Sequence, residues 1–181
     1  MNAVALPRKS LLLLSIALMA ASCCAVCAPK ILAQAPAARA ARLEIAGAVK
    51  TSLSLSVADL KSMPRTTVRV GGQNGQSVQV YEGVALDELL RRAGVPQGGD
   101  LGGPWMAAYA LAIAADGYRA VFSLSELNPG IGGVEVLVAD TLDGAALGEG
   151  SGPFRLVVPG DKRAARWVRM LRSIRVEQPA N

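Results

Sequence analysis

The sequence predicts a single α+β domain in which strands paired as hairpins are interspersed with short helices. Three turn dipeptides, Asn74-Gly75, Asp116-Gly117 and Asp143-Gly144, separate short apolar runs and favour hairpins over long crossover connections. Short segments with helical start signals stand between these runs. The chain has 181 residues, 51% of them hydrophobic, which is enough for one domain of ordinary size.

Residues 1–35 have the pattern of an export signal peptide. Arg8 and Lys9 form the charged start, and an apolar stretch from Leu11 to Ala21 follows, with small residues beyond it that suit cleavage. The apolar run continues to Ala28, which is close to the length that spans a bilayer. An uncleaved N-terminal membrane anchor is therefore the alternative to a removed signal peptide.

The segment after this leader changes in character. Residues 36–42 are rich in alanine and arginine without periodicity and are expected to be a flexible linker, and the folded domain is expected at residues 43–178. We expect a periplasmic or secreted protein. The alternative is an N-terminally anchored protein facing the periplasm, whose contact with the membrane is through the uncleaved leader.

The composition excludes several kinds of chemistry. The chain has no histidine, and its three cysteines, Cys23, Cys24 and Cys27, all lie in the leader. Nucleophilic sites that need histidine, histidine metal sites and a disulfide in the mature domain are therefore not expected. Aromatic residues make up 4% of the chain and the net charge is +5, of which the leader contributes part, so nucleic acid is not an expected partner.

The N-terminal half of the domain is expected to open with a strand at residues 43–49. Ser56 to Asp59 form a capping box, in which two side chains satisfy free backbone N–H groups, and this predicts a short helix that ends before Pro64. Alternating apolar residues at 66–70 and 77–82 predict a hairpin.

A second helix is expected to follow that hairpin, because Leu86, Leu89 and Leu90 share one helical face and Gly94 stops the helix. Residues 95–104, rich in glycine and proline, are expected to form a loop. The segment at 105–115 is too rich in alanine to assign by itself, but the Asp116-Gly117 turn and the run at 118–122 favour a β-hairpin.

The C-terminal half is expected to continue with a strand at 118–122, in which Tyr118 is either a cross-strand packing partner or a ligand contact and Asp116 forms the turn. A second capping box at 123–126 predicts another short helix. Continuous apolar runs at 134–139 and 154–158 predict buried strands.

Arginines recur at every third position after the last of these strands, at Arg163, Arg166, Arg169, Arg172 and Arg175. The planar guanidinium stays charged and suits phosphate or another anion. A period of three does not place all five side chains on one side of a helix or a strand, so a solvated basic face is the alternative. Trp167 is expected to anchor the core beneath them, and Arg155 either points to solvent or is paired inside.

Four motifs occur in order over residues 43–177: Ser54-Leu55-Ser56 with Asp59-Leu60, Tyr81-Glu82-Gly83-Val84 with Leu86, Leu89-Leu90 and Ala93-Gly94, Asp116-Gly117-Tyr118 with Phe122, and a closing Gly152-Pro153-Phe154-Arg155-Leu156-Val157-Val158-Pro159-Gly160-Asp161 with Trp167. Together they resemble the molybdopterin-binding oxidoreductase domain family of the sulfite-oxidase type. The resemblance implies a single α+β domain with a mixed β-sheet, hairpins and short helices.

The resemblance also implies a site. In catalytic members a dithiolene pterin holds molybdenum, and a cysteine thiolate at the end of the strand before the hairpin completes the coordination. That place falls near Val70 and Gly71, whose side chains cannot ligate a metal, and Ser151-Gly152 stands where many members have His-Gly. No metal ligand and no catalytic residue is assigned. The positions expected near the pterin phosphate are Arg155, Lys162, Arg163 and Arg166.

We therefore expect an exported molybdopterin-dependent oxidoreductase-like protein, either redox-active or a degenerate member that binds the pterin cofactor or another anionic ligand. The alternative is a non-catalytic periplasmic binding or protein-interaction module on the same fold, and a structural envelope protein is a third reading. The expected partners are the pterin or a small anion, together with a redox or envelope protein.

Overall fold

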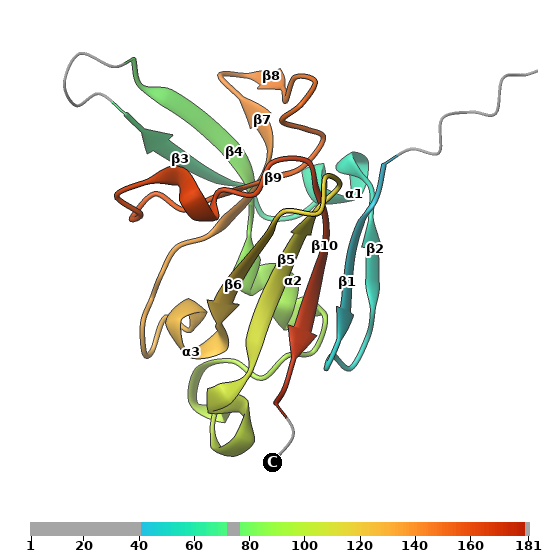
Figure 1. Cartoon of the computed structure of the whole chain (residues 1–181), viewed down its shortest axis with the longest axis vertical. Helices are drawn as coiled ribbons and strands as arrows, with labels where there is room; N and C mark the ends of the chain where they lie inside the picture. The colour runs from blue at the N-terminus through green and yellow to red at the C-terminus, as the bar shows by residue number, and fades with distance from the viewer. Residues whose placement is uncertain (1–40, 72–76, 180–181) are drawn as a thin grey trace, which may run out of the picture. The chain divides into compact units, whose positions relative to one another are not determined.

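The first sheet is built from strands β1 (Leu43–Gly47), β2 (Leu53–Leu55), β5 (Tyr109–Ala114), β6 (Arg119–Ser123) and β10 (Leu171–Glu177). Their order is β2-β1-β10-β5-β6, as Figure 1 shows. β1 and β10 are parallel, whereas the other neighbouring pairs are antiparallel. The last strand of the chain thus lies at the centre of this sheet, between its N-terminal strands and the β5–β6 hairpin.

The second sheet is built from β3 (Thr66–Val70), β4 (Gln79–Ala85), β7 (Leu137–Leu142), β8 (Ala145–Ala146) and β9 (Arg155–Val157). The order is β3-β4-β7-β8, and β9 also pairs with β7. Where β4 meets β7, the register shifts between Glu82 and Gly83 so that Asp140 is the extra residue of a bulge. A Cβ on Gly83 would lie 2.0 Å from the Val138 carbonyl oxygen, so this close approach needs glycine.

The helices are short. They are α1 (Val57–Lys61), α2 (Leu86–Arg92) and α3 (Leu124–Leu127), with 3-10 turns η1 (Gly98–Asp100), η2 (Gly103–Ala107) and η3 (Ala164–Arg166). Both expected capping boxes are present: Ser56 Oγ accepts from the Asp59 backbone N–H at 3.2 Å, and Ser123 Oγ accepts from the Glu126 N–H at 3.0 Å. Local capping chemistry therefore places α1 and α3 where the sequence predicted them.

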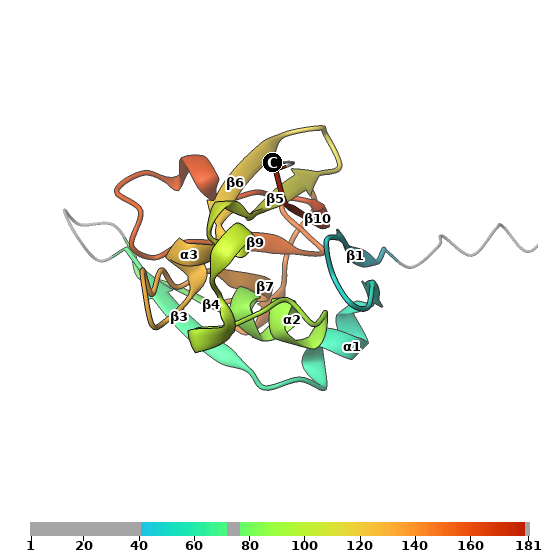
Figure 2. The same cartoon turned by 90° about the horizontal axis from the view of Figure 1, so that it is seen from below.

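The larger core cluster lies between the sheets, and Figure 2 shows β5, β6 and β10 across from β4, β7 and β9. Phe122, Phe154, Leu89 and Ile174 are among its fully buried members. A smaller cluster lies on the other face of the second sheet and consists of Val68, Tyr81, Leu137, Ala139 and Val157. The second sheet is therefore covered on both faces around β7, whose first five residues are all buried.

One expected strand is displaced along the chain. The apolar run predicted a strand at 134–139, but β7 occupies Leu137–Leu142. The backbone N–H of Val134 donates to the Glu126 carbonyl at 2.8 Å, and the Val136 carbonyl accepts from the Leu86 N–H at 2.8 Å. This segment thus holds the ends of α3 and α2 instead of pairing in the sheet.

Strands β2, β8 and β10 were not predicted from the sequence. β2 and β8 have three and two residues and are too short to show an alternating pattern, and β10 lies within the arginine series, which was interpreted as an anion site or a solvated face. The segment at 105–115 forms part of η2 and then β5, which pairs with β6 in the β-hairpin expected around Asp116-Gly117. The expected α+β class with hairpins and short helices is confirmed.

The computed structural model describes residues 41–71 and 77–179, all within one unit at residues 36–181. The predicted signal peptide at residues 1–35, its cysteines and the Asn74-Gly75 turn lie outside the described residues. Within the described ranges, no helix has the length and apolar character needed to cross a membrane.

Candidate anion-binding site

Arg155 lies on β9 between Phe154 and Leu156, both of which are fully buried. Its Nη1 donates to the Tyr81 hydroxyl at 3.2 Å and to Ser151 Oγ at 3.3 Å. Its Nε is buried and has no hydrogen-bond partner among the described residues. A buried charged donor without an acceptor is unfavourable, so the Arg155 Nε lacks a hydrogen bond that such a group normally makes. Arg155 is thus half-buried and held inside, not on an open sheet face.

The Trp167 ring also contacts the Arg155 guanidinium. The Trp167 Nε1 donates to the Val158 carbonyl at 3.0 Å, and its ring meets the Tyr81 ring edge-on with 6.0 Å between centroids. The Arg155 guanidinium carbon lies 5.4 Å from the Tyr81 centroid and 5.6 Å from the Trp167 centroid, within the range of cation–π attraction. Trp167 also packs against both core clusters, which agrees with its expected role as a core anchor.

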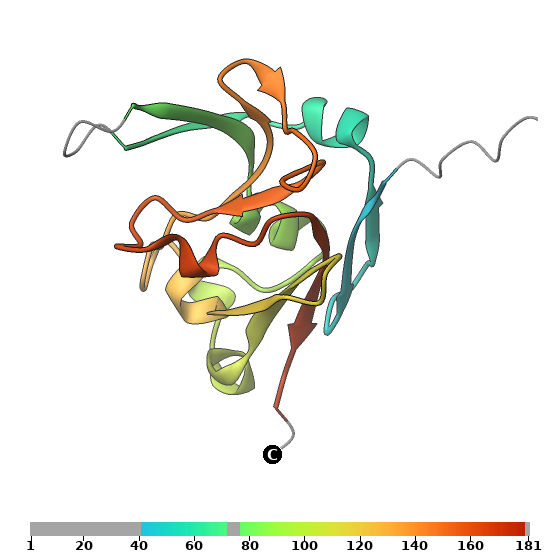
Figure 3. The ribbon, with the colours of Figure 1, turned by 45° about the horizontal axis from the view of Figure 1, so that its top comes forward.

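Two cavities flank Trp167. A cavity of about 420 Å³ is lined by Trp167 together with Val70, Gly71, Ser77 and Gln79 of the β3–β4 hairpin. Another of about 340 Å³ is lined by Trp167, Arg155, Arg169, Tyr118 and Asp116. In Figure 3 the orange-red segment that contains η3 runs between the green β3–β4 hairpin and the yellow β5–β6 hairpin. We call the second cavity the Arg155 cavity.

The β5–β6 turn forms one wall of the Arg155 cavity. Asp116 Oδ1 accepts a hydrogen bond from the Tyr118 backbone N–H at 2.9 Å, so Asp116 is a turn former, as expected. Tyr118 precedes β6 and its hydroxyl donates to the Ala165 carbonyl at 2.5 Å. The expected role of Tyr118 as a cross-strand packing partner is therefore not observed, because its hydroxyl ties the hairpin to the η3 segment.

Arg169 is a site residue that the sequence did not single out. It is exposed and lines the Arg155 cavity, so two guanidinium groups face the same space. The only sequence signal was its membership of the three-residue arginine series, in which all five members looked alike. Two like charges around one small cavity favour the binding of an anion between them.

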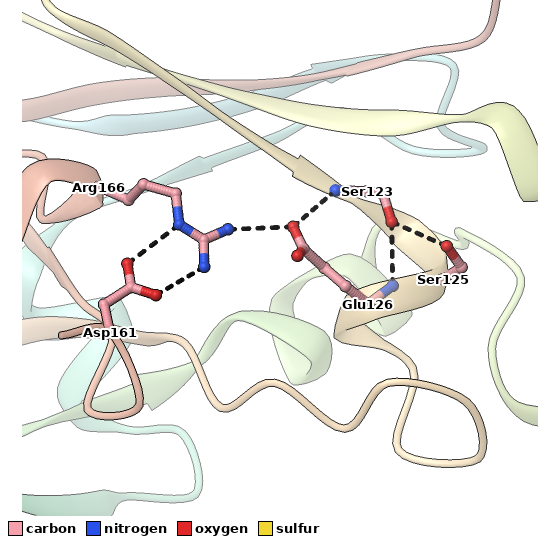
Figure 4. Close-up of polar contacts among 5 residues, drawn as sticks. All are labelled: Ser123, Ser125, Glu126, Asp161 and Arg166. Carbon is pink, nitrogen blue, oxygen red and sulfur yellow. Dashed lines mark hydrogen bonds and ion pairs between the residues drawn. The ribbon is translucent and has the colours of Figure 1, made fainter.

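Arg166, in contrast, forms ion pairs with two carboxylates (Figure 4). Its Nε and Nη2 donate to the two carboxylate oxygens of Asp161 at 3.0 and 2.7 Å, and its Nη1 donates to Glu126 at 3.2 Å. The hydrogen bonds to Asp161 raise the pKa of Arg166 against the opposing effect of partial burial. The guanidinium carbon also lies 4.9 Å from the Phe122 ring centroid. Arg166 therefore joins the η3 segment to α3 and is already neutralised.

Lys162 and Arg163, the other two basic residues expected near a phosphate, are both exposed. Within the described ranges neither side chain makes a hydrogen bond or an ion pair, and neither lines the Arg155 cavity. The four predicted binding residues are thus separated in role: Arg155 faces the cavity, Arg166 is paired with acids, and Lys162 and Arg163 face solvent.

The chemistry of these residues fits one end of a molybdopterin cofactor and not the other. The two arginines that line one cavity, Arg155 and Arg169, suit a phosphate. At the end of β3, where the resemblance implies a thiolate, Val70 and Gly71 line the larger cavity and offer no side-chain ligand. Among residues 41–71 and 77–179 there is also no group of three acidic, histidine or cysteine side chains that could hold a metal ion.

Comparisons with known proteins identify the family. The family model described as the oxidoreductase molybdopterin binding domain matches residues 32–181. The crystal structure of the sulfane dehydrogenase SoxCD from Paracoccus pantotrophus is similar, with a TM-score of 0.60, 27% sequence identity, and coverage of 77% of this chain and 39% of that chain. No protein with a curated description matches. The chain therefore belongs to the molybdopterin-binding oxidoreductase domain family, as its ordered motifs predicted.

Proposed function

We propose that this chain is an exported, molybdopterin-dependent oxidoreductase-like protein whose Arg155 cavity holds a phosphate-bearing ligand, either the pterin cofactor or another anion. The observation that carries the proposal is the cavity that Arg155 and Arg169 line together, at an arginine whose buried Nε has no acceptor among the described residues. A phosphate in that cavity would neutralise both guanidinium groups. Export is proposed from the charged start and apolar stretch of the leader.

The chain's own residues would anchor and orient the ligand. The Tyr81 hydroxyl and Ser151 Oγ accept hydrogen bonds from Nη1 of Arg155, and the Tyr81 and Trp167 rings contact its guanidinium. When bound, the family's cofactor supplies oxygen-atom or electron transfer. The similarity to SoxCD supports a redox protein as the kind of partner, although this chain spans 39% of the SoxCD chain.

Phosphate binding tests this proposal directly. Replacement of Arg155 by leucine removes the guanidinium and is expected to weaken binding of inorganic phosphate by about tenfold or more, as loss of one charge-assisted hydrogen bond requires. The matched control is Arg163→Ala, which removes an exposed arginine outside the cavity and is expected to leave the affinity within about threefold of wild type. Titration calorimetry that gives equal affinities for all three proteins would contradict the proposal.

A non-catalytic binding or protein-interaction module is the second candidate, favoured by Val70 and Gly71 at the place of the thiolate. Elemental analysis for molybdenum and fluorescence of the oxidised pterin, on protein exported from a host that makes the cofactor, separate the two. Stoichiometric pterin supports the oxidoreductase-like protein. Well-folded protein that binds phosphate but carries neither molybdenum nor pterin supports the module. The intact mass of the same protein tests removal of the leader.

A further inference from the structure

Trp167 is the one described residue that lines both cavities beside the η3 segment. Arg155, the anchor proposed above, lines only the 340 Å³ cavity. Val70 and Gly71, at the place where a metal-binding member would carry its thiolate, line only the 420 Å³ cavity. Trp167 therefore borders both the cavity of the guanidinium and the cavity at the end of β3.

The indole is held in this position from several sides. Its N–H donates to the Val158 carbonyl at 3.0 Å, and its ring stands at 90° to the Tyr81 ring. The ring also packs against both hydrophobic clusters and lies beside the Arg155 guanidinium. Movement of Trp167 out of the way would break a hydrogen bond, an aromatic contact and a cation–π contact together.

We propose that Trp167 is a specificity-determining residue that divides one groove into two cavities and restricts the ligand held by Arg155 to a compact anion. The inference rests on the proposed function, since it concerns the size of the ligand bound at the same guanidinium. A free phosphate-like anion needs only the 340 Å³ cavity that Arg155, Arg169 and Trp167 line. When a phosphate carries a large planar ring system, that ring system meets the indole of Trp167.

The test compares inorganic phosphate with neopterin monophosphate, a pterin that carries a phosphate, in calorimetric titrations of wild type and Trp167→Ala. Removal of the indole joins the cavities, so Trp167→Ala is expected to bind neopterin monophosphate about tenfold more tightly than wild type does. Inorganic phosphate is expected to bind Trp167→Ala more weakly, by up to about tenfold, because the ring beside the Arg155 guanidinium is lost.

Two further variants keep the result interpretable. Trp167→Leu retains apolar packing against the clusters while shortening the partition, and it replaces Trp167→Ala if the alanine variant does not fold. Trp105→Phe changes the other tryptophan, which packs against the larger cluster and lines neither cavity. It is expected to match wild type with both ligands.

The possible outcomes separate the two proposals. If wild type binds neopterin monophosphate as tightly as the Trp167 variants do, the partition is wrong while anion binding at Arg155 stands. If the variants lose both ligands equally, Trp167 supports the site and does not select its ligand, which also overturns the inference. If no protein binds either ligand, the proposed function fails, and the inference fails with it.

Discussion

Arg65 and Asp140 form a bidentate ion pair in the second sheet. Nη1 and Nη2 of Arg65 lie 2.6 and 2.8 Å from the two Asp140 carboxylate oxygens. Arg65 directly precedes β3 and Asp140 is the bulged residue of β7, so the pair crosses β4. The Asp140 side chain is fully buried, and Thr141 Oγ1 donates to it at 2.6 Å. The hydrogen bonds to Asp140 raise the pKa of Arg65.

Loss of Arg65 is therefore expected to destabilise the fold. Arg65→Met leaves the Asp140 carboxylate buried without its cation and is expected to cost about 2–4 kcal/mol, less than for a fully buried pair because Arg65 is partly exposed. Denaturant unfolding measures this change. The double variant Arg65→Met with Asp140→Leu removes both charges and is expected to recover much of the loss. A single variant within about 0.5 kcal/mol of wild type would contradict the prediction.

Arg166 is expected to matter for stability and not for anion binding. Arg166→Met breaks the contacts with Asp161 and Glu126 and is expected to cost about 1–2 kcal/mol, since these groups are partly exposed. Its phosphate affinity is expected to stay within about threefold of wild type, because the guanidinium is already neutralised. Unfolding and titration calorimetry measure the two effects. An affinity loss equal to that of Arg155→Leu would place Arg166 in the binding site.

Glu88 is expected to make the stability depend on acid pH. Partial burial raises the pKa of Glu88, but hydrogen bonds from Arg91 and Arg92 lower it more, so the pKa lies below its ordinary value of 4.5. A lowered folded-state pKa means that stabilisation is fully present above 4.5 and is lost as the pH falls through the folded-state value.

The variant Glu88→Gln therefore costs about 0.5 kcal/mol near neutral pH, the size of exposed ion pairs within a helix. Its difference from wild type is expected to shrink as the pH falls well below 4.5. Urea unfolding at neutral and acidic pH checks the direction, and a difference that grows on acidification would show that the pKa is not lowered.

Gly83 is expected to tolerate no side chain. In Gly83→Ala the new Cβ would meet the Val138 carbonyl oxygen at 2.0 Å and the Ala139 Cα at 2.6 Å, so β4 and β7 must separate. We expect a loss of about 2–3 kcal/mol in unfolding free energy. Gly102→Ala is the control, because Gly102 has φ −156° and no atom within 4 Å of an added Cβ. Equal stability of both variants would contradict the close approach.

The elements that local chemistry determines were predicted well from the sequence. The capping boxes at Ser56 and Ser123 start α1 and α3, since each needs only residues three positions apart. The strand at Thr66–Val70 has the predicted bounds. The displaced β7 shows the limit, because residues 134–136 are as apolar as a strand but bond to α2 and α3, which an apolar run cannot reveal.

The candidate site was predicted in part. The family resemblance placed Arg155 near a phosphate, whereas its position within an apolar strand left a solvent-facing role open; in the structure Arg155 lines the cavity, and its buried Nε has no partner among the described residues. Arg163 and Arg169 belong to the same series at a spacing of three, yet Arg169 lines the Arg155 cavity and Arg163 does not. Which arginine meets a ligand depends on the η3 turn and on the carboxylates nearby, and neither is encoded in the spacing.

The sequence by itself determined the α+β class, the family, the capped helices and the lack of a cysteine or histidine ligand in the domain, because these follow from residue identity and from neighbours close in the chain. The tertiary structure alone decided that Arg166 is neutralised by Asp161 and Glu126, that Tyr118 holds Ala165, and that Trp167 separates two cavities. These relationships join segments distant in the chain, so they exist only once the two sheets have packed against each other.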